Sequence, residues 1–248
     1  MKPYNTTQLN PQNSFESHVY HRDQFAHFLR WTYVLKRARI GMNILDFGCG
    51  SGEMLKVFYK NLYKPKRYLG LDIRDAWKNN KKKYFDNWNF KPEFYKHDLV
   101  KDNFDYGNEW DIITSFEVIE HIGKNNAEQY LENIKKHCSK DTIVLLSTPN
   151  YDEKVGAAGN HIYDSGNGKE VQEFKHSELE SILKKNFDIK EKYGTFASQK
   201  DYKKLLNDWQ IKMFNELRKY YDTNLLSVIM APFFPEQSRN CLYILKKR

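Results

Sequence analysis

Two carboxylates and an imidazole lie close together in the segment Glu117-Val118-Ile119-Glu120-His121. Residues three and four positions apart share one face of a helix, so a helical segment would bring Glu117, Glu120 and His121 together. Such a group can act as a general base that removes a proton from an alcohol or an amine. It can also hold a divalent cation that lowers the pKa of a hydroxyl group and orients it. These residue types leave both chemistries open.

A glycine-rich turn precedes this segment and is a candidate ligand site. Gly48, Gly50 and Gly52 follow the apolar run at residues 43–47. Glycine lacks a Cβ, so the chain there can adopt positive φ and approach a ligand closely. A dinucleotide fingerprint would need its third glycine where Glu53 stands, and a P-loop would need a following Gly-Lys-Ser/Thr. The spacing therefore disfavours NAD, FAD and a P-loop.

Several segments resemble the landmarks of class I S-adenosylmethionine-dependent methyltransferases, and they follow in the right order. The stretch Asp-Phe-Gly-Cys-Gly-Ser-Gly at residues 46–52 resembles the first motif of that family. Residues 68–73 resemble the second strand, which ends in an acid, here Asp72. Asp98 follows a short strand and resembles the acid that meets the adenine amino group. Residues 110–121 resemble the fourth strand and the loop on the catalytic face.

The resemblance implies a fold, a cofactor and a set of contacts. The implied fold is an α/β Rossmann-like methyltransferase fold with a mostly parallel seven-stranded sheet and helices on both faces. The implied cofactor is S-adenosylmethionine. Its strongest expected contact is Asp72, because a carboxylate there accepts charge-assisted hydrogen bonds from both ribose hydroxyls. The expected cofactor contacts are Asp46, Gly48, Gly50, Gly52, Asp72, Ile73, Asp98 and Phe116.

On the substrate side, the resemblance implies methyl transfer to an oxygen or a nitrogen. The candidate catalytic residues are Glu117, His121 and His161, and Glu120 is expected to complement the dipole at the start of a helix. We predict base and substrate contacts here and no resident metal. A metal-dependent family that methylates the 2′-oxygen at RNA 3′ ends is similar in its Glu-x-x-Glu-His, which a histidine follows after Thr-Pro-Asn. Here Thr-Pro-Asn at residues 148–150 is followed by His161 and His176. That enzyme is one alternative, and a non-catalytic methyltransferase-like binding subunit is the other.

Alternating strand and helix patterns predict how these residues are positioned. An order of this kind is typical of a parallel sheet with helices packed on it. We predict strands at residues 43–47, 67–71, 93–97, 111–115, 142–147, 188–193 and 240–247, and helices at 52–60, 75–85, 126–137 and 177–185. Residues 151–169 carry four glycines among polar residues and predict a long loop. His176 is expected to be exposed beside the cap of the last helix.

The chain is expected to form one domain with two additions. Residues 1–40 are predicted to form an N-terminal arm and a lid helix, which spans residues 15–39 with a buried stripe of Phe25, Phe28, Leu29 and Leu35 among others. Residues 41–248 are predicted to form the methyltransferase domain, with a helical insertion at about 199–238. Six apolar residues recur at helical spacing in the insertion and predict either a buried stripe or a substrate contact. They are Tyr202, Leu206, Trp209, Met213, Leu217 and Tyr220.

Composition indicates the kind of partner and the compartment. The net charge of +8 favours an anionic acceptor, which can be a small molecule, a nucleotide or a nucleic acid. Two DNA methyltransferase classes are disfavoured, because the fourth strand is not followed by Asp/Asn-Pro-Pro-Tyr/Phe and no cysteine follows a proline.

Three scattered cysteines, no signal-peptide pattern and no long apolar run predict a cytoplasmic protein without membrane contact. The oligomeric state is not predicted.

Overall fold

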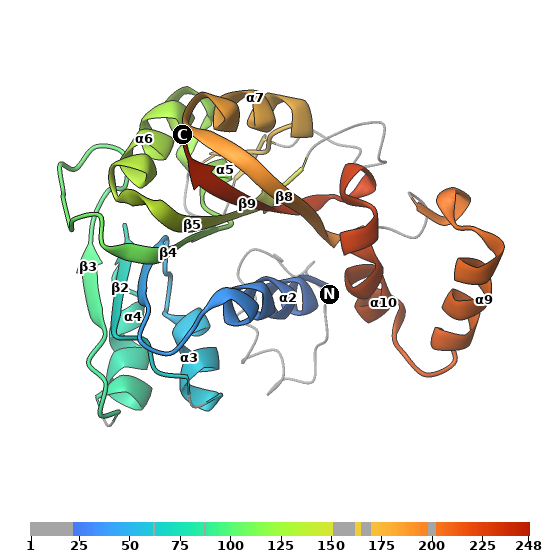
Figure 1. Ribbon diagram of the computed structural model, residues 1–248, viewed down its shortest axis with the longest axis horizontal. Helices are drawn as coiled ribbons and strands as arrows, with labels where there is room; N and C mark the ends of the chain where they lie inside the picture. The colour runs from blue at the N-terminus through green and yellow to red at the C-terminus, as the bar shows by residue number, and fades with distance from the viewer. Residues whose placement is uncertain (1–21, 62, 87, 151–161, 165–169, 198–201) are drawn as a thin grey trace.

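The computed structural model describes residues 22–61, 63–86, 88–150, 162–164, 170–197 and 202–248. Within these residues the central sheet has seven strands (Figure 1). Their order is β3 (Glu93–Lys96), β2 (Arg67–Asp72), β1 (Asn43–Phe47), β4 (Trp110–Phe116), β5 (Cys138–Pro149), β9 (Asn240–Lys247) and β8 (Phe187–Phe196). The first five strands are parallel, and β9 runs antiparallel to both β5 and β8. The predicted mostly parallel seven-stranded sheet is confirmed.

Helices and short turns connect the strands. The α-helices are α2 (Arg22–Arg37), α3 (Glu53–Lys60), α4 (Trp77–Asn80), α5 (Ile119–Ile122), α6 (Ala127–Lys136), α7 (His176–Asn186), α9 (Asp208–Leu217) and α10 (Thr223–Met230). The π-helix η2 (Lys81–Phe85) continues α4, and 3₁₀ turns lie at η3 (Lys124–Asn126), η5 (Lys203–Leu205), η6 (Ala231–Phe233) and η7 (Pro235–Gln237). A separate hairpin pairs β6 (Ile162–Asp164) with β7 (Glu170–Gln172).

Successive residues of each central strand face opposite sides of the sheet, and each side carries its own core. Leu45 and Ile113 belong to the core that includes Tyr130 of α6 and Leu179 of α7. Their neighbours Ile44 and Ile112 belong to the core that includes side chains of α2 and α3. Figure 1 shows α6 and α7 above the sheet and α2 and α3 below it. Near-continuous apolar strands are needed because both faces are covered.

The largest departures from the sequence-based elements lie outside the central strands. The helix predicted over residues 75–85 is a short α-helix followed by a π-helix. In α2 the fully buried positions include Ala26, Trp31 and Val34, whereas the predicted stripe is only partly buried. The loop predicted at 151–169 contains a strand at 162–164, and the rest of it lies outside the described residues.

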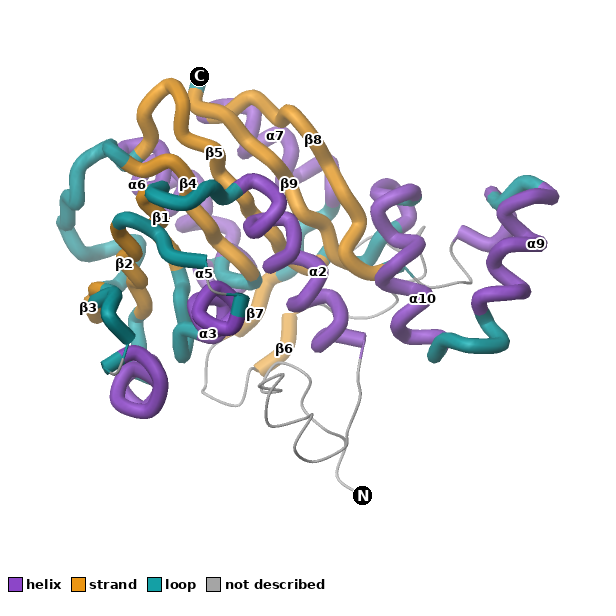
Figure 2. The backbone as a smooth tube through the Cα atoms, turned by 60° about the horizontal axis from the view of Figure 1, so that its bottom comes forward, coloured by secondary structure: helices purple, strands orange, loops and turns teal. Residues whose placement is uncertain are grey.

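The helical segment between β8 and β9 packs around a small core of its own. That core contains Tyr202, Phe214, Leu226 and Met230 among others. Figure 2 shows α9 at the periphery of the molecule, beyond α10. The predicted single stripe is wrong in part, because Trp209 and Tyr220 are 68% and 79% exposed. The chain divides into η5, α9 and α10 instead of continuing as one helix.

Candidate active site

The glycine-rich turn leaves the carboxyl end of β1 and is fixed to the neighbouring strand. The backbone N–H groups of Gly48 and Cys49 both donate to the carbonyl oxygen of Leu71, at 2.7 and 3.0 Å. Gly48, Gly50 and Gly52 have φ values of 81°, 54° and 78°. A Cβ on residue 48 would meet a methyl group of Val118 at 2.2 Å, whereas a Cβ on residue 50 would meet nothing within 4 Å. The turn thus has a packed side and an open side.

Asp72 ends β2 and is tied to this turn. Its Oδ2 accepts from the backbone N–H of Gly50 at 2.8 Å, and its Oδ1 accepts from that of Arg74 at 2.8 Å. Each carboxylate oxygen has two acceptor positions, so both can still accept from a ligand hydroxyl. Ile73 follows with its side chain 40% exposed, and Phe116 is partly buried at the end of β4.

The two other predicted acidic contacts are engaged in different ways. Asp98 follows β3 and accepts from the backbone N–H groups of Val100 and Lys101, so its Oδ1 stabilises its own turn. Asp46 is only 4% exposed, and its two oxygens accept from Tyr68 Oη and Thr114 Oγ1, each at 2.7 Å. Burial raises the pKa of Asp46 to about 6, although both hydrogen bonds lower it. The Asp46 carboxylate therefore lies within the protein interior, where it joins β1 to both neighbouring strands.

The raised pKa of Asp46 makes stability depend on pH. Between its ordinary value of 3.8 and about 6, the folded chain keeps a proton that the unfolded chain has released. Stability therefore falls as pH rises through this window, by about 3 kcal/mol for this one group. We therefore expect the free energy of unfolding of Asp46→Asn, relative to that of the wild type, to be higher at pH 7 than at pH 4 by about the same amount. Urea unfolding at both pH values measures the gain, and the exposed Asp141→Asn is the control. An equal pH dependence in wild type and Asp46→Asn would contradict the assignment.

Glu117 begins the loop that follows β4 and is not helical. Among the described residues it is the only non-glycine residue with positive φ, at 57°. The helix α5 begins at Ile119 after Val118, so the predicted helical face shared by Glu117, Glu120 and His121 is wrong. The left-handed conformation turns Glu117 back toward the sheet, where its backbone N–H donates to the carbonyl of Ser147 at 2.9 Å.

Three groups from distant parts of the chain hold the Glu117 carboxylate. Ser147 Oγ donates to Oε1 at 2.8 Å, and Asn240 Nδ2 donates to Oε2 at 2.7 Å. Arg30 Nη1 of α2 lies 3.4 Å from Oε1. The sequence analysis missed both Arg30 and Asn240. The available signal was an arginine one position before Trp31, between the buried positions Ala26 and Val34 of the same helix.

Glu120 and His121 lie on α5 in contrasting surroundings. Glu120 is 2% exposed and accepts from Thr148 Oγ1 at 2.9 Å. Burial raises the pKa of Glu120 well above its usual value, and the nearby Glu117 carboxylate raises it further. His121 Nε2 lies 4.0 Å from Glu120 Oε1, and the His121 side chain is 38% exposed. The structure thus brings Glu117, Glu120 and His121 together, while His161 lies outside the described residues.

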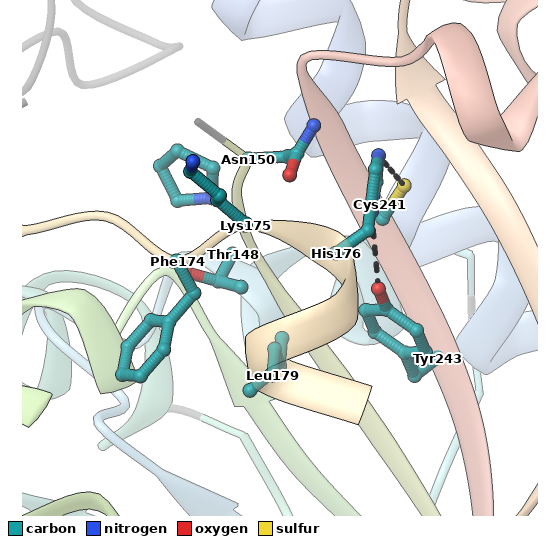
Figure 3. Close-up of a pocket in the computed structure, with 9 residues that line it drawn as sticks. Thr148, Asn150, Phe174, Lys175, His176, Leu179, Cys241 and Tyr243 are labelled. Atoms are coloured by element: carbon teal, nitrogen blue, oxygen red, sulfur yellow. Dashed lines mark hydrogen bonds between the residues drawn. The ribbon is translucent and has the colours of Figure 1, made fainter. Parts of the chain in front are cut away.

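A narrow hollow with no space for a water molecule lies at the end of β5, beside the Thr148 side chain that donates to Glu120 (Figure 3). Its lining includes Thr148 and His176. His176 is the first residue of α7 and is 8% exposed, so the predicted exposed position is wrong. Burial lowers the pKa of His176, and the Lys192 charge lowers it further. Neutral His176 donates from Nε2 to the carbonyl of Ser238 at 3.1 Å and accepts at Nδ1 from Tyr243 Oη at 3.2 Å.

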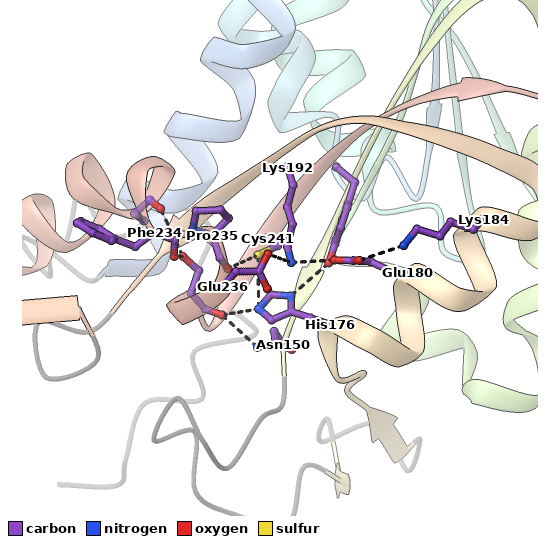
Figure 4. A network of polar contacts seen from close by, with 12 residues as sticks. Asn150, His176, Glu180, Lys184, Lys192, Phe234, Pro235, Glu236 and Cys241 are labelled. Carbon is purple, nitrogen blue, oxygen red and sulfur yellow. Dashed lines mark hydrogen bonds and ion pairs between the residues drawn. The ribbon is translucent and has the colours of Figure 1, made fainter. Parts of the chain in front are cut away.

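An ion-pair network beside His176 holds the turn that leads into β9 (Figure 4). Lys192 donates to Glu180 of α7 and to Glu236 of η7, both at 2.8 Å. Asn150 Nδ2 donates to the carbonyl of Ser238 at 3.1 Å. These contacts fix the start of β9, and with it Asn240, at the same edge of the sheet as Glu117.

Comparison with known proteins identifies the family. Residues 20–230 match the model of a family described as a methyltransferase domain. The chain belongs to this methyltransferase family. The recognition of a class I S-adenosylmethionine-dependent methyltransferase from its sequence landmarks is therefore confirmed. A search of the curated proteins finds no match. In the described part of this methyltransferase, no helix has both the length and the apolar character needed to cross a bilayer.

Solved structures with low sequence identity share the fold. A Clostridium acetobutylicum S-adenosylmethionine-dependent methyltransferase is 13% identical with a TM-score of 0.58, and the match covers 94% of this chain and 95% of that one. The Burkholderia thailandensis 1,6-didemethyltoxoflavin-N1-methyltransferase is 13% identical with a TM-score of 0.57, covering 90% and 78%. The small RNA methyltransferase HEN1 is 19% identical with a TM-score of 0.59, covering 90% of this chain and 25% of that one.

The positions of the potential metal ligands bear on the metal-dependent alternative. Among the residues that the structure describes, no group of three or more His, Cys, Asp or Glu side chains is arranged to hold a metal ion. Glu117 is instead held by Arg30, Ser147 and Asn240. His161, a histidine of the metal-dependent alternative, stands outside the described residues.

Proposed function

We propose that this methyltransferase transfers the methyl group of S-adenosylmethionine to an oxygen or nitrogen of an anionic acceptor, with His121 removing the acceptor's proton. The observation that carries the proposal is the juxtaposition of two sites. A glycine turn tied to Asp72 lies directly against the loop that presents His121, because Val118 of that loop fills the space over Gly48. The cofactor and the acceptor would then be bound next to each other, in sites that adjoin at Val118.

The residues of the turn fit the cofactor. The open side at Gly50 leaves room for a ligand against the backbone, and Asp72 has acceptor capacity for both ribose hydroxyls. Ile73 and Phe116 offer apolar surface, and Asp98 lies at the end of the neighbouring strand. Asp46 fixes the end of β1, from which the turn leaves, to β2 and β4. When bound, the sulfonium supplies an activated methyl group, and the chain contributes mainly position and proton removal.

Residues 117–122, which follow β4, are called the acceptor loop below. Of the three polar residues Glu117, Glu120 and His121 on this loop, His121 is best suited to be the base. The Glu117 oxygens are already engaged, because they accept hydrogen bonds from Ser147 and Asn240 and lie beside the Arg30 guanidinium. Glu120 is buried, and burial raises its pKa well above the usual value, so its charged form is disfavoured. His121 is exposed, and imidazole is the side chain that ordinarily exchanges protons near neutral pH.

The charge distribution supports an anionic acceptor. Residues 53–96 contain 12 of the 40 Lys and Arg residues but only five of the 32 Asp and Glu residues, which gives +7 of the chain's net +8. This segment forms α3, β2, α4, η2 and β3. A concentrated positive field attracts phosphate and carboxylate groups over several ångströms. Nucleotides, nucleic acids and anionic metabolites all satisfy this requirement.

A labelling experiment tests the proposed reaction. The enzyme is incubated with methyl-labelled cofactor and separate pools of RNA, DNA and small metabolites, and the labelled product is identified. We expect label on an oxygen or nitrogen of an anionic compound. Cofactor binding without transfer to any pool would favour the non-catalytic binding subunit. Label on a neutral or cationic acceptor would refute the acceptor class.

Asp72→Ala tests the cofactor site. The variant loses the ribose partner and the support of Gly50, so we expect affinity for S-adenosylhomocysteine to fall about 10- to 100-fold, as for hydrogen bonds to a charged group. Titration calorimetry measures this fall. Asp75→Ala is the matched control, because Asp75 is exposed and forms an ion pair with the neighbouring Lys78. Equal affinities of Asp72→Ala and the wild type would mean that the ribose is held elsewhere.

A further inference from the structure

We propose that Arg30 is a positioning residue of the active site. Through Glu117, its buried guanidinium holds the acceptor loop against the glycine turn, so that α2 sets the shape of the cofactor site. The inference deepens the proposed function, because it takes S-adenosylmethionine as the ligand of that turn. It also assigns Glu117 a structural task in place of the catalytic one expected from the sequence.

The first step of the argument is the burial of Arg30. Its side chain is 2% exposed, and its Nη1 lies 3.4 Å from Glu117 Oε1 and 3.2 Å from Asn240 Oδ1. Its Nη2 lies 2.9 Å from His27 Nδ1, and its Nε has no partner among the described residues. A buried guanidinium without a compensating charge is strongly unfavourable. Glu117 supplies that compensating charge, so each of the two residues requires the other.

The second step is the backbone of Glu117. A left-handed φ of 57° is unfavourable for a residue with a Cβ and persists only where the surroundings enforce it. Here the surroundings are three elements that are distant in sequence: α2 with Arg30, β5 with Ser147 and β9 with Asn240. Of these three side chains, only Arg30 carries a charge. Its loss should therefore release the loop more than the loss of either neutral donor.

The third step connects the loop to the cofactor turn. Val118 follows Glu117, and its Cγ2 occupies the place where a Cβ of residue 48 would be. Gly48 begins the turn whose next glycine, Gly50, donates to Asp72. A shift of the loop therefore removes the packed side of the turn while leaving the open side unchanged. The expected consequence is weaker cofactor binding even though α2 does not belong to the glycine motif.

The test compares Arg30→Met with Arg37→Met. Arg37 lies on the same helix and pairs with Glu191 at 2.7 Å, far along the sheet from the acceptor loop. Both variants are expected to lower the unfolding temperature. Titration calorimetry with S-adenosylhomocysteine, at a temperature where both are folded, should give about tenfold or greater weakening for Arg30→Met and no change for Arg37→Met. Arg30→Lys keeps the charge and should recover part of the affinity.

A double variant distinguishes pairing from general damage. If Arg30 acts through Glu117, adding Glu117→Gln to Arg30→Met should weaken binding no further. The proposal would be overturned if the losses of affinity from the two substitutions multiplied in the double variant. It would also be overturned if Arg30→Met and Arg37→Met had equal affinities.

Hydrogen exchange gives a readout that needs no ligand. Backbone amides of residues 117–122 should exchange at least tenfold faster in Arg30→Met than in Arg37→Met. If the wild type failed to bind S-adenosylhomocysteine, the proposed function would fail, and this comparison would still decide whether Arg30 holds the loop. Equal exchange in the two variants would refute the inference even if cofactor binding were normal.

Discussion

Replacing His121 by alanine is expected to lower the rate of methyl transfer by about 10²- to 10⁴-fold, the usual contribution of a positioned general base. The expectation follows from the surroundings of the acceptor loop, where His121 is exposed while Glu117 is ion-paired and Glu120 is buried. The measurement is the initial rate with labelled cofactor and the acceptor identified by labelling. Affinity for S-adenosylhomocysteine should be unchanged, since His121 is assigned to the acceptor.

Chelation separates base chemistry from metal chemistry at the same residues. With His121 as the base, activity should survive EDTA. Loss of activity with EDTA, restored by added divalent ions, would move the function to a metal-dependent enzyme acting on a vicinal diol such as an RNA 3′ end. Full activity of His121→Ala with and without EDTA would exclude both mechanisms. The segment around His161 would then be the next place to seek the base.

Among substitutions in the glycine turn, Gly48→Ala is expected to cause the largest loss of both stability and cofactor affinity. The new Cβ would stand 2.2 Å from Val118 Cγ2 in a left-handed conformation. Overpacking of this kind destabilises proteins by about 1–3 kcal/mol, and the positive φ adds about 1 kcal/mol or more. We also expect affinity for S-adenosylhomocysteine to fall at least 100-fold. Urea unfolding and calorimetry measure the two effects.

Two matched variants separate the causes of that loss. Gly107 has a φ of 76° with nothing within 4 Å of an added Cβ, so Gly107→Ala should show only the loss from positive φ and no change in cofactor affinity. Adding Val118→Ala to Gly48→Ala removes the clashing methyl groups and should restore part of both stability and affinity. If Val118→Ala restored neither, the close approach of loop and turn would not be the cause.

The sequence was sufficient for the central sheet and for the position of the glycine turn. Apolar runs such as residues 43–47 and 142–147 are buried on both faces, so local composition specifies them strongly. Gly48 and Gly50 need positive φ for reasons of local backbone geometry, and Asp72 follows its strand directly. These features depend on neighbours in the chain, which is why the landmarks could be found in order.

The acceptor loop could not be predicted in the same way, because its contacts join distant segments. Glu117 and Asn240 are 123 positions apart, and Arg30 and Asn240 are 210 apart. Helical spacing suggested one shared face for Glu117 and Glu120, but the hydrogen bonds to Ser147 and Asn240 favour a left-handed residue instead. His176 was expected at the surface because only its own helix cap was considered. Its burial depends on Tyr243 and Ser238, which come more than 60 positions later.

The position of β9 between β5 and β8 has a consequence for the order of events during synthesis. β8 (Phe187–Phe196) pairs with no strand of the described sheet except β9, whose residues are made some 50 positions later. A nascent chain that has reached residue 239 can assemble the parallel strands and the glycine turn, but β8 still lacks its partner. Glu117 then lacks Asn240 as well. We therefore expect the pairing of β8 and the contact of Asn240 with Glu117 to be the last parts of the sheet and the site to form.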